Sequence, residues 1–250
     1  MTGVQLLLVA AAGLAAGMIN SIAGSGSLIT FPTLLAVGLP PLQANVSNSI
    51  GLVPGSFSGA YGYRSELRGR LREVLALSVP MCLGAIVGVV LLLKLPARVF
   101  EVVVPILVAA ASVLVVAQPA ISRGFRLRGT NRVGLGAGLL VLGVYAGYFG
   151  AAQGIMLLAL MGLFLQESLQ RINAYKTLIA GAAACVAGLI FIVIAPVSWP
   201  HTAALAVSSL AGGRLGAVVA TRVPDTPLRW GIGVFGIAVA ARLAVGYHLV

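Results

Sequence analysis

A run of small and polar residues, Gly24-Ser25-Gly26-Ser27, interrupts a long apolar stretch near the N-terminus. Glycine and serine disfavour a continuous helix, and in a membrane irregular backbone persists only where it is buried in protein or lines a cavity. The half-helices at such a break expose unpaired backbone N–H groups, and a helix N-terminus carries about half a positive charge. The run therefore indicates an anion-binding site, although small residues of this kind also let helices cross closely.

Amide side chains stand on both sides of this run. Asn20 precedes it, and Asn45 and Asn48 follow it. The two later asparagines share one helix face because they are three residues apart, and Pro40-Pro41 fixes the start of that helix. A polar amide in a bilayer needs a partner, so at the least these side chains bond to backbone freed by the break. The predicted first half of the site is Asn20, Gly24, Ser25, Gly26, Ser27, Asn45 and Asn48.

A second break lies half a chain later, in the segment GVYAGYFGAAQG at residues 143–154, which contains Gly150 and Gly154. It is followed by Asn173-Ala174-Tyr175-Lys176-Thr177, which corresponds in position to Ala44-Asn45-Val46-Ser47-Asn48 after the first break. Lys176 is the first choice for a charged contact to a substrate, because it occupies the repeated position. A lysine just inside a membrane helix can also extend its ammonium to the interface, and that alternative stays open. The predicted second half of the site is Gly150, Gly154, Asn173 and Lys176.

Arg214 is another basic residue inside an apolar run, and Gly212, Gly213 and Gly216 flank it. Deep arginines are costly and usually face a cavity or a partner. No acidic residue lies inside a predicted span, so Arg214 suits an anion pathway. Bonding to backbone carbonyls or reaching an interface explains it equally well.

The composition identifies the solvent around these residues. Of 250 residues, 60% are hydrophobic and only 8% are charged, against about 25% charged in soluble domains. Arg64 is the first charged residue, so residues 1–63 carry no charged side chain. No soluble domain of this size could bury an uncharged segment of that length. A water-soluble enzyme is therefore excluded, and most of the chain faces lipid.

The net charge of +11 does not indicate nucleic acid, because the basic residues form short clusters between apolar runs rather than one patch. Cys82 and Cys185 lie within apolar runs without a metal-type spacing. We expect no metal, no cofactor and no nucleic acid. The expected partners are membrane lipids and a small anionic substrate, and the sequence is compatible with a homo-oligomer.

The apolar runs predict an all-α polytopic membrane protein of about eight hydrophobic segments, given that one crossing takes about 20 residues. Two runs, 4–37 and 133–165, are too long for one ordinary span, and each contains one of the breaks. Each is therefore predicted to form two half-helices. The six runs that fit one crossing are 44–63, 74–93, 102–121, 177–195, 202–220 and 230–249.

The recurrence of a broken element followed by three spanning helices predicts two pseudo-symmetric repeats in a single transporter domain, 1–250. Repeat one covers 1–121, repeat two covers 132–250, and a basic loop, 122–131, joins them. Neither half alone could enclose a site.

Positive charge discriminates between two topologies, since cytoplasmic loops carry an excess of Lys and Arg. If each broken run crosses once, the loop basic residues divide as eight against five; if each enters and returns as a re-entrant hairpin, they divide as eleven against two. The second arrangement, with both termini outside, is favoured. The two exceptions are Lys94 and Arg98; the eleven are Arg64, Arg68, Arg70, Arg72, Arg123, Arg126, Arg128, Arg132, Arg171, Arg222 and Arg229.

The lack of carboxylates inside the predicted spans bears on mechanism. A proton-coupled carrier commonly binds its proton on a buried Asp or Glu. An exporter of anions needs no such group, because an inside-negative potential contributes about 2.3 kcal/mol per charge per 100 mV towards expulsion.

Several segments resemble the sulfite exporter TauE/SafE family of membrane permeases. The first half carries the resemblance in GMINSIAGSGSLITFP at 17–32, GLPP at 38–41, ANVSNS at 44–49 and PGS at 54–56, and the second half in GYFGA at 147–151 and NAYKT at 173–177. Ser25, Ser27 and Thr177 depart from the residues that are frequent in the family.

The resemblance implies a permease, not an enzyme, that exports a small anion such as sulfite, a sulfonate or sulfoacetate across the cytoplasmic (inner) membrane of a bacterium. Two other classes remain as alternatives. A non-transporting membrane assembly factor would need no polar site at depth. An intramembrane hydrolase could use Ser25 as nucleophile and His201 as base, but Ala23 stands where the rhomboid-type Gly-x-Ser-Gly pattern requires glycine.

Overall fold

The computed structural model describes residues 2–124, 131–219 and 225–248, and every regular element in these ranges is an α-helix. The predicted all-α polytopic class is confirmed. The predicted joining loop at 122–131 falls mostly outside these residues, as does Arg222. The helices are α1 (Gly3–Ile22), α2 (Ser27–Ala36), α3 (Pro41–Gly51), α4 (Val53–Gly62), α5 (Arg64–Leu67), α6 (Leu71–Lys94), α7 (Ala97–Gly124), α8 (Arg132–Tyr148), α9 (Gln153–Phe164), α10 (Leu169–Ile194), α11 (Trp199–Val219) and α12 (Asp225–His248).

Helix starts follow local capping chemistry. α3 begins at Pro41, as the Pro40-Pro41 pair predicts. The hydroxyl of Thr2 accepts a hydrogen bond from the Gln5 N–H at the start of α1, and Ser168 caps α10 in the same way through the Arg171 N–H. Such caps satisfy N–H groups that have no partner within the helix.

Each of the six single-crossing runs lies on a helix or, for 44–63, on the consecutive pair α3 and α4. Five helical segments in the described residues are long and apolar enough to cross a membrane: Gly3–Ile22, Leu71–Lys94, Arg98–Ala117, Leu169–Ile194 and Trp199–Val219. The count of eight segments stays a prediction. Large apolar side chains such as Val133 and Val193, 82% and 80% exposed, cover the outer faces, as lipid requires.

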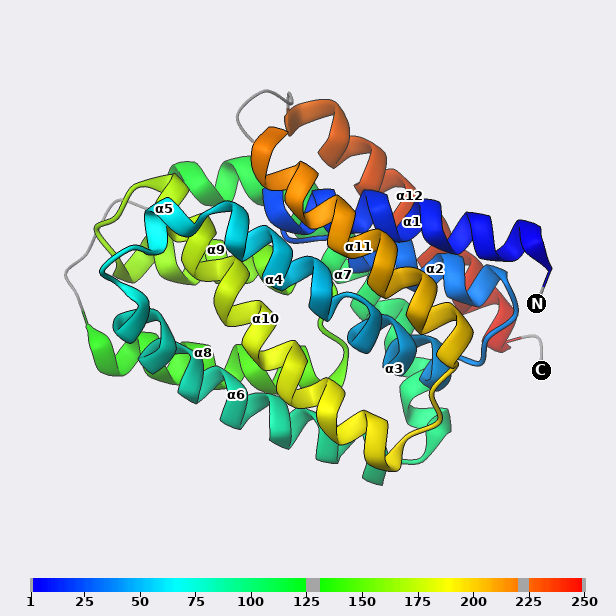
Figure 1. Ribbon diagram of the computed structural model, residues 1–250. Coiled ribbons are helices and arrows are strands. Elements are labelled where there is room, and N and C mark those ends of the chain that lie inside the picture. The colour runs from blue at the N-terminus through cyan, green and yellow to red at the C-terminus, as the bar shows by residue number, and fades with distance from the viewer. Residues whose placement is uncertain (1, 125–130, 220–224, 249–250) are drawn as a thin grey trace.

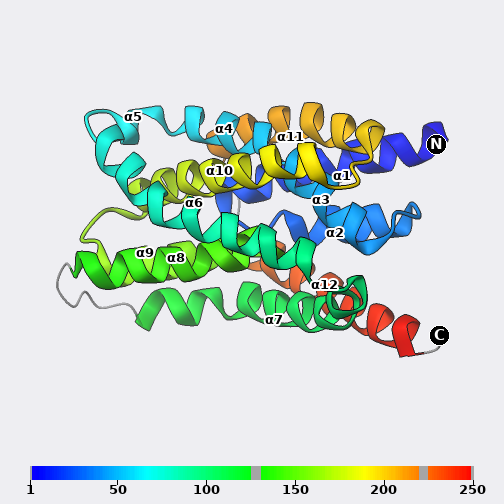
Figure 2. The same ribbon diagram turned by 90° about the horizontal axis from the view of Figure 1, so that it is seen from below.

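Both long runs break where predicted and then fold back. Residues 23–26 separate α1 from α2, and residues 149–152 separate α8 from α9. The Gln5 side-chain amide donates to the Val37 carbonyl at 3.4 Å, which ties the start of α1 to the end of α2. Each broken run is therefore a hairpin that enters and returns at one end of the bundle (Figures 1 and 2), and the arrangement in which each run crosses once is not formed.

The hairpins place the loops at two ends. The start of α1 and the end of α12 lie together with the α2–α3, α6–α7 and α10–α11 loops, whereas α5 and the α9–α10 loop lie at the opposite end (Figure 1). At that opposite end Arg70 pairs with Glu167 at 3.8 Å and Arg171 pairs with Glu66 at 3.8 Å. The end that carries α5 is thus rich in arginine, and we call it the basic end.

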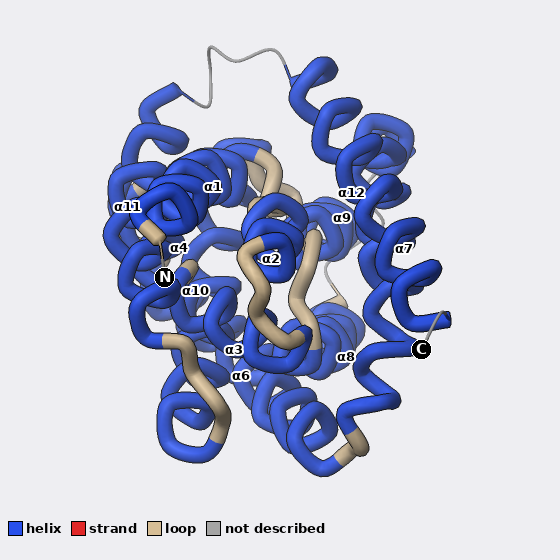
Figure 3. Tube along the Cα trace, turned by 90° about the vertical axis from the view of Figure 1, so that its right-hand side faces the viewer, coloured by secondary structure: helices blue, strands red, loops and turns tan. Residues whose placement is uncertain are grey.

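Helix contacts come in matched pairs between the two halves. α1 packs on α11 as α8 packs on α6, α4 packs on α11 as α10 packs on α6, and α2 meets α12 as α9 meets α7. A pseudo-two-fold axis relating two inverted repeats would produce this pattern; the repeat boundaries stay a prediction. α2 lies in the middle of the bundle (Figure 3), where Leu28, Phe31 and Leu34 are almost fully buried.

Candidate functional site

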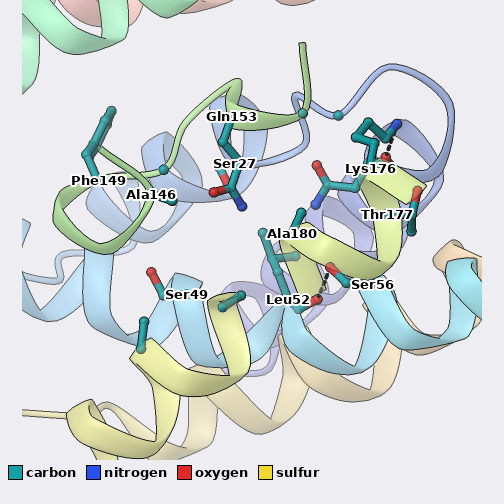
Figure 4. Close-up of a pocket in the computed structure, with 16 residues that line it drawn as sticks. Ser27, Ser49, Leu52, Ser56, Ala146, Phe149, Gln153, Lys176, Thr177 and Ala180 are labelled. Atoms are coloured by element: carbon teal, nitrogen blue, oxygen red, sulfur yellow. Dashed lines mark hydrogen bonds between the residues drawn. The ribbon is translucent and has the colours of Figure 1, made fainter. Parts of the chain in front are cut away.

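A cavity of about 50 Å³ lies where the two breaks meet. Its wall combines the end of α1, both breaks and the faces of α3, α4 and α10 that point toward them (Figure 4). The polar lining side chains are Asn20, Ser27, Ser49, Ser56, Gln153, Lys176 and Thr177, and the remaining lining residues are Gly24, Leu52, Ala146, Phe149, Gly150, Gly154, Ala180, Ala184 and Ala187.

The two breaks touch through their backbones. The Gly154 N–H donates to the Gly24 carbonyl at 3.2 Å. A Cβ on Gly24 would lie 2.5 Å from the Cα of Gly154, and a Cβ on Gly154 would lie 2.4 Å from the Cα of Gly24. Only glycine permits this approach, and Gly24 also has φ +80°, a conformation that disfavours other residues. The predicted glycines Gly24 and Gly154 therefore form the crossing point.

Two helix N-termini face the cavity. Ser27 begins α2 and Gln153 begins α9, and both line the wall. The Asn20 side-chain oxygen accepts a hydrogen bond from the Gly26 N–H at 2.7 Å, so one free donor of α2 is satisfied. Within the described residues the Ser27 N–H has no acceptor. The N-terminal ends of two helices thus border one small space, where the Gln153 and Gly154 N–H groups of α9 are bonded to the Gly150 and Gly24 carbonyls and the Ser27 N–H of α2 is free for an anion.

Lys176 brings its amino group to this space. Its side chain is 1% exposed, and its ammonium donates to the Asn20 carbonyl at 3.2 Å and to Asn173 Oδ1 at 3.1 Å. An ammonium has three N–H donors, so one remains for a ligand. No carboxylate in the described part of the chain pairs with it, and a buried cation without a counter-ion is costly. An anion in the cavity would neutralise it.

Other predicted residues stand behind the cavity wall. The Asn45 amide donates to the Tyr148 carbonyl at 3.1 Å, at the end of α8. Asn48 Oδ1 accepts from the Thr30 hydroxyl, and Asn173 orients Lys176. Ser25 is fully buried, and its hydroxyl has no partner among the described residues. Gly26 packs against the Ala16 carbonyl. These residues support the site but do not line it.

Arg214 is not brought to the cavity. Its side chain is exposed, with its guanidinium carbon 5.1 Å from the centroid of the Tyr61 ring. The neighbouring glycines serve packing: a Cβ on Gly212, Gly213 or Gly216 would collide with α1 or α4. The structure therefore gives Arg214 no contact with the cavity.

Four polar lining residues were missed in the sequence. Gln153 is the one polar side chain in residues 149–154, and its oxygen is buried without a partner in the described structure. Ser49 lies on α3 and Ser56 lies seven residues later on α4, and Thr177 adjoins Lys176. Figure 4 shows Gln153 and Ser27 on one side of the space, with Ser49 and Ser56 on the other. Gln153 could have been identified in the sequence as the one polar side chain beside the second break.

The hydrolase alternative requires Ser25 to contact His201. His201 Nδ1 instead lies 2.7 Å from the Ser198 hydroxyl in the α10–α11 loop region, and Ser25 forms no hydrogen bond through its side chain in the described residues. The pair is not formed. The described residues contain no group of three His, Cys, Asp or Glu side chains that could hold a metal ion.

The family model described as sulfite exporter TauE/SafE matches residues 9–243. The chain belongs to the sulfite exporter TauE/SafE family. The resemblance found in the sequence is thereby confirmed, and TauE/SafE membership makes the protein a membrane transporter.

Curated relatives agree with the TauE/SafE assignment. A probable membrane transporter protein of Haemophilus influenzae is 27% identical over 246 residues, which cover 96% of this chain and 95% of the relative. The probable membrane transporter protein YfcA of Escherichia coli K12 is 26% identical over 237 residues, or 93% of this chain and 87% of the relative. A Sinorhizobium protein, probable membrane transporter protein ORF9, is 36% identical over 95 residues, 38% of this chain and 36% of the relative. None of these three names states a substrate.

Proposed function

We propose that this transporter exports a small sulfur-containing anion across the bacterial cytoplasmic membrane, and that the anion binds in the cavity between the two breaks. The observation that carries the proposal is Lys176, an ammonium buried in the cavity wall with a hydrogen-bond donor left over and no carboxylate partner among the described residues. The N-termini of α2 and α9 add partial positive charge at the same place.

The cavity size ranks the candidate substrates. A cavity must have a volume of about 10–15 Å³ to hold one water molecule. A cavity of about 50 Å³ therefore suits an ion of a few heavy atoms. Sulfite has this size. Sulfonates and sulfoacetate need the cavity to widen, so sulfite is the first candidate.

The direction follows from charge. The spanning helices carry no carboxylate near the cavity in the described residues, which argues against proton coupling. An inside-negative potential drives an anion outward. The basic end, with Arg70 and Arg171, is then the cytoplasmic end, and both termini are external. Labelling a Gly3→Cys variant that lacks Cys82 and Cys185 tests this orientation: an impermeant thiol reagent should react from outside the cell, and reaction only from the cytoplasmic side contradicts it.

The experiment is sulfite efflux from proteoliposomes with an imposed potential. Lys94 is the matched control for Lys176, because these are the two lysines of the chain and Lys94 is exposed at the end of α6. Lys176→Met should lower sulfite flux at least about tenfold, since losing the partner of a buried charge costs about 2–5 kcal/mol. Lys94→Met should leave flux within about twofold.

Two results would contradict the proposal in different ways. Equal sulfite flux in Lys176→Met and the wild type would show that the protein transports sulfite but that the cavity is not part of the transport path. No movement of sulfite, sulfoacetate or taurine by the wild type would instead favour the non-transporting assembly factor.

A further inference from the structure

Arg214 belongs to a second group of residues, at the basic end of the bundle. Tyr61 lies at the end of α4 and is 54% exposed. The guanidinium carbon of Arg214 on α11 lies 5.1 Å from its ring centroid, and that of Arg64 lies 4.9 Å from it. Arg64 also donates to the Tyr61 carbonyl at 3.4 Å. Two cations from different halves of the chain therefore share one aromatic ring.

The two helices are fixed against each other at this level. A Cβ on Gly62 would lie 2.3 Å from the Ala217 Cβ, so α4 and α11 are in close contact beside the ring. The position of Arg214 relative to Tyr61 thus depends on backbone packing and not only on a flexible side chain. Such a fixed arrangement can recognise a ligand group of defined size.

The charges in this group are not balanced by protein. Neither Arg64 nor Arg214 forms an ion pair in the described residues, whereas Arg70 and Arg171 at the same end are paired with Glu73, Glu167 and Glu66. A cation–π contact attracts a guanidinium to the ring but leaves its charge unchanged. Two like charges beside one ring therefore call for an anion.

The surroundings indicate where that anion comes from. Arg214 lies on the same exposed face of α11 as Leu210 and Val218, which are 50% and 66% exposed, and this face meets lipid. Arg214 is about one and a half turns from the end of α11, and exposed tyrosines such as Tyr61 are enriched at membrane interfaces. Guanidinium groups bind phosphate through paired hydrogen bonds.

We propose that Arg64, Tyr61 and Arg214 form a binding site for the phosphate of an anionic phospholipid headgroup. The site is separate from the transport cavity and does not depend on what the cavity transports. It gives Arg214 a function at the membrane interface.

The test titrates purified protein in a neutral detergent with phosphatidylglycerol, phosphatidylcholine or inorganic phosphate, and measures bound lipid by native mass spectrometry and the thermal unfolding midpoint. Arg214→Gln and, separately, Arg64→Gln should each lower the affinity for phosphatidylglycerol about fivefold. Arg68→Gln is the control, because Arg68 is exposed at the same end without an ion pair in the described residues, and it should leave the affinity within about twofold.

Three results would overturn the proposal. An equal loss in Arg68→Gln would show diffuse attraction to negative charge. Equal binding of phosphatidylglycerol and phosphatidylcholine would show that the headgroup charge is not recognised. If inorganic phosphate raised the unfolding midpoint as much as phosphatidylglycerol does, and if Arg214→Gln abolished that rise, the result would assign the site to the free ion.

Discussion

The two breaks have nearly the same backbone design. Gly24 in the first and Gly150 in the second adopt positive φ, +80° and +72°, and each break ends at the start of a helix whose first residue lines the cavity. In each half, the helix that follows the hairpin donates a side-chain hydrogen bond to the end of the other half's first half-helix: Lys176 on α10 to the Asn20 carbonyl, and Asn45 on α3 to the Tyr148 carbonyl. The geometry at the two breaks is thus reciprocal.

The chemistry at the two breaks differs. The first is polar, with Asn20, Ser25 and Ser27, and it receives the ammonium of Lys176. The second is mostly apolar, with Ala151 and Ala152 before Gln153, and it receives a neutral amide. A duplicated backbone therefore supplies two positive helix ends, while only one break receives a formal charge. The comparison suggests that the first break determines anion binding and that the second mainly determines architecture.

The largest expected effect comes from substituting the glycines at which the two breaks cross. Gly24→Ala should lower the free energy of unfolding by about 3 kcal/mol or more, because it adds both a backbone collision at 2.5 Å and the strain of a left-handed residue with a Cβ. Gly154→Ala adds only the collision and should cost about 1–3 kcal/mol. Thermal unfolding in detergent measures both.

Gly136→Ala is the control for these variants, because nothing lies within 4 Å of its added Cβ. It should be neutral or slightly stabilising, since alanine is the better helix former. If Gly24→Ala were as mild as Gly136→Ala, the crossing of the two breaks would not be a structural requirement.

The next prediction distinguishes the contributions of the two breaks to anion binding. Asn20→Ala removes the acceptor of the Gly26 N–H, and Asn45→Ala removes the donor to Tyr148, so each should cost about 1–2 kcal/mol of stability. Only Asn20 lines the cavity. The rise in unfolding midpoint caused by added sulfite should therefore shrink in Asn20→Ala and persist in Asn45→Ala. An equal loss in both variants would contradict the assignment of anion binding to the first break.

The sequence predicted the elements better than it predicted the wall of the cavity. Apolar length and Gly-Ser interruptions locate the helices and both breaks, because these depend on local propensity and on lipid as the solvent. Charge counting favoured the hairpins, which the structure has. The residues that face the cavity were harder to predict. Ser49 and Gln153 line the cavity, whereas the Asn48 side chain accepts a hydrogen bond from the Thr30 hydroxyl. Which side of a buried polar helix faces a cavity depends on packing between distant segments, and spacing alone does not determine it.

A smaller effect tests the apolar break alone. Ala152 is the one non-glycine residue with positive φ, 56°, among the described residues. Ala152→Gly should relieve this strain and stabilise the protein by about 0.5–1 kcal/mol, after the greater chain entropy of glycine is offset. Gly150→Ala should do the reverse and cost about 1–2 kcal/mol, because it places a side chain at positive φ and a Cβ 2.9 Å from the Ala146 carbonyl oxygen. Chemical denaturation with both variants measures the pair, and destabilisation by Ala152→Gly would mean that the buried methyl group matters more than the backbone strain.

The smallest effect concerns Ser25, whose hydroxyl is fully buried with no partner in the described residues. A buried hydroxyl without a hydrogen bond costs free energy, so Ser25→Ala should stabilise the substrate-free protein by up to about 1 kcal/mol. Because Ser25 does not line the cavity, sulfite flux should stay within about twofold of the wild type. A tenfold fall in flux would mean instead that the first break moves during transport and presents this hydroxyl to the anion. The unpaired hydroxyl would then be a contact made in another state of the transport cycle, and the polar character of the first break would extend beyond the residues that line the cavity in this conformation.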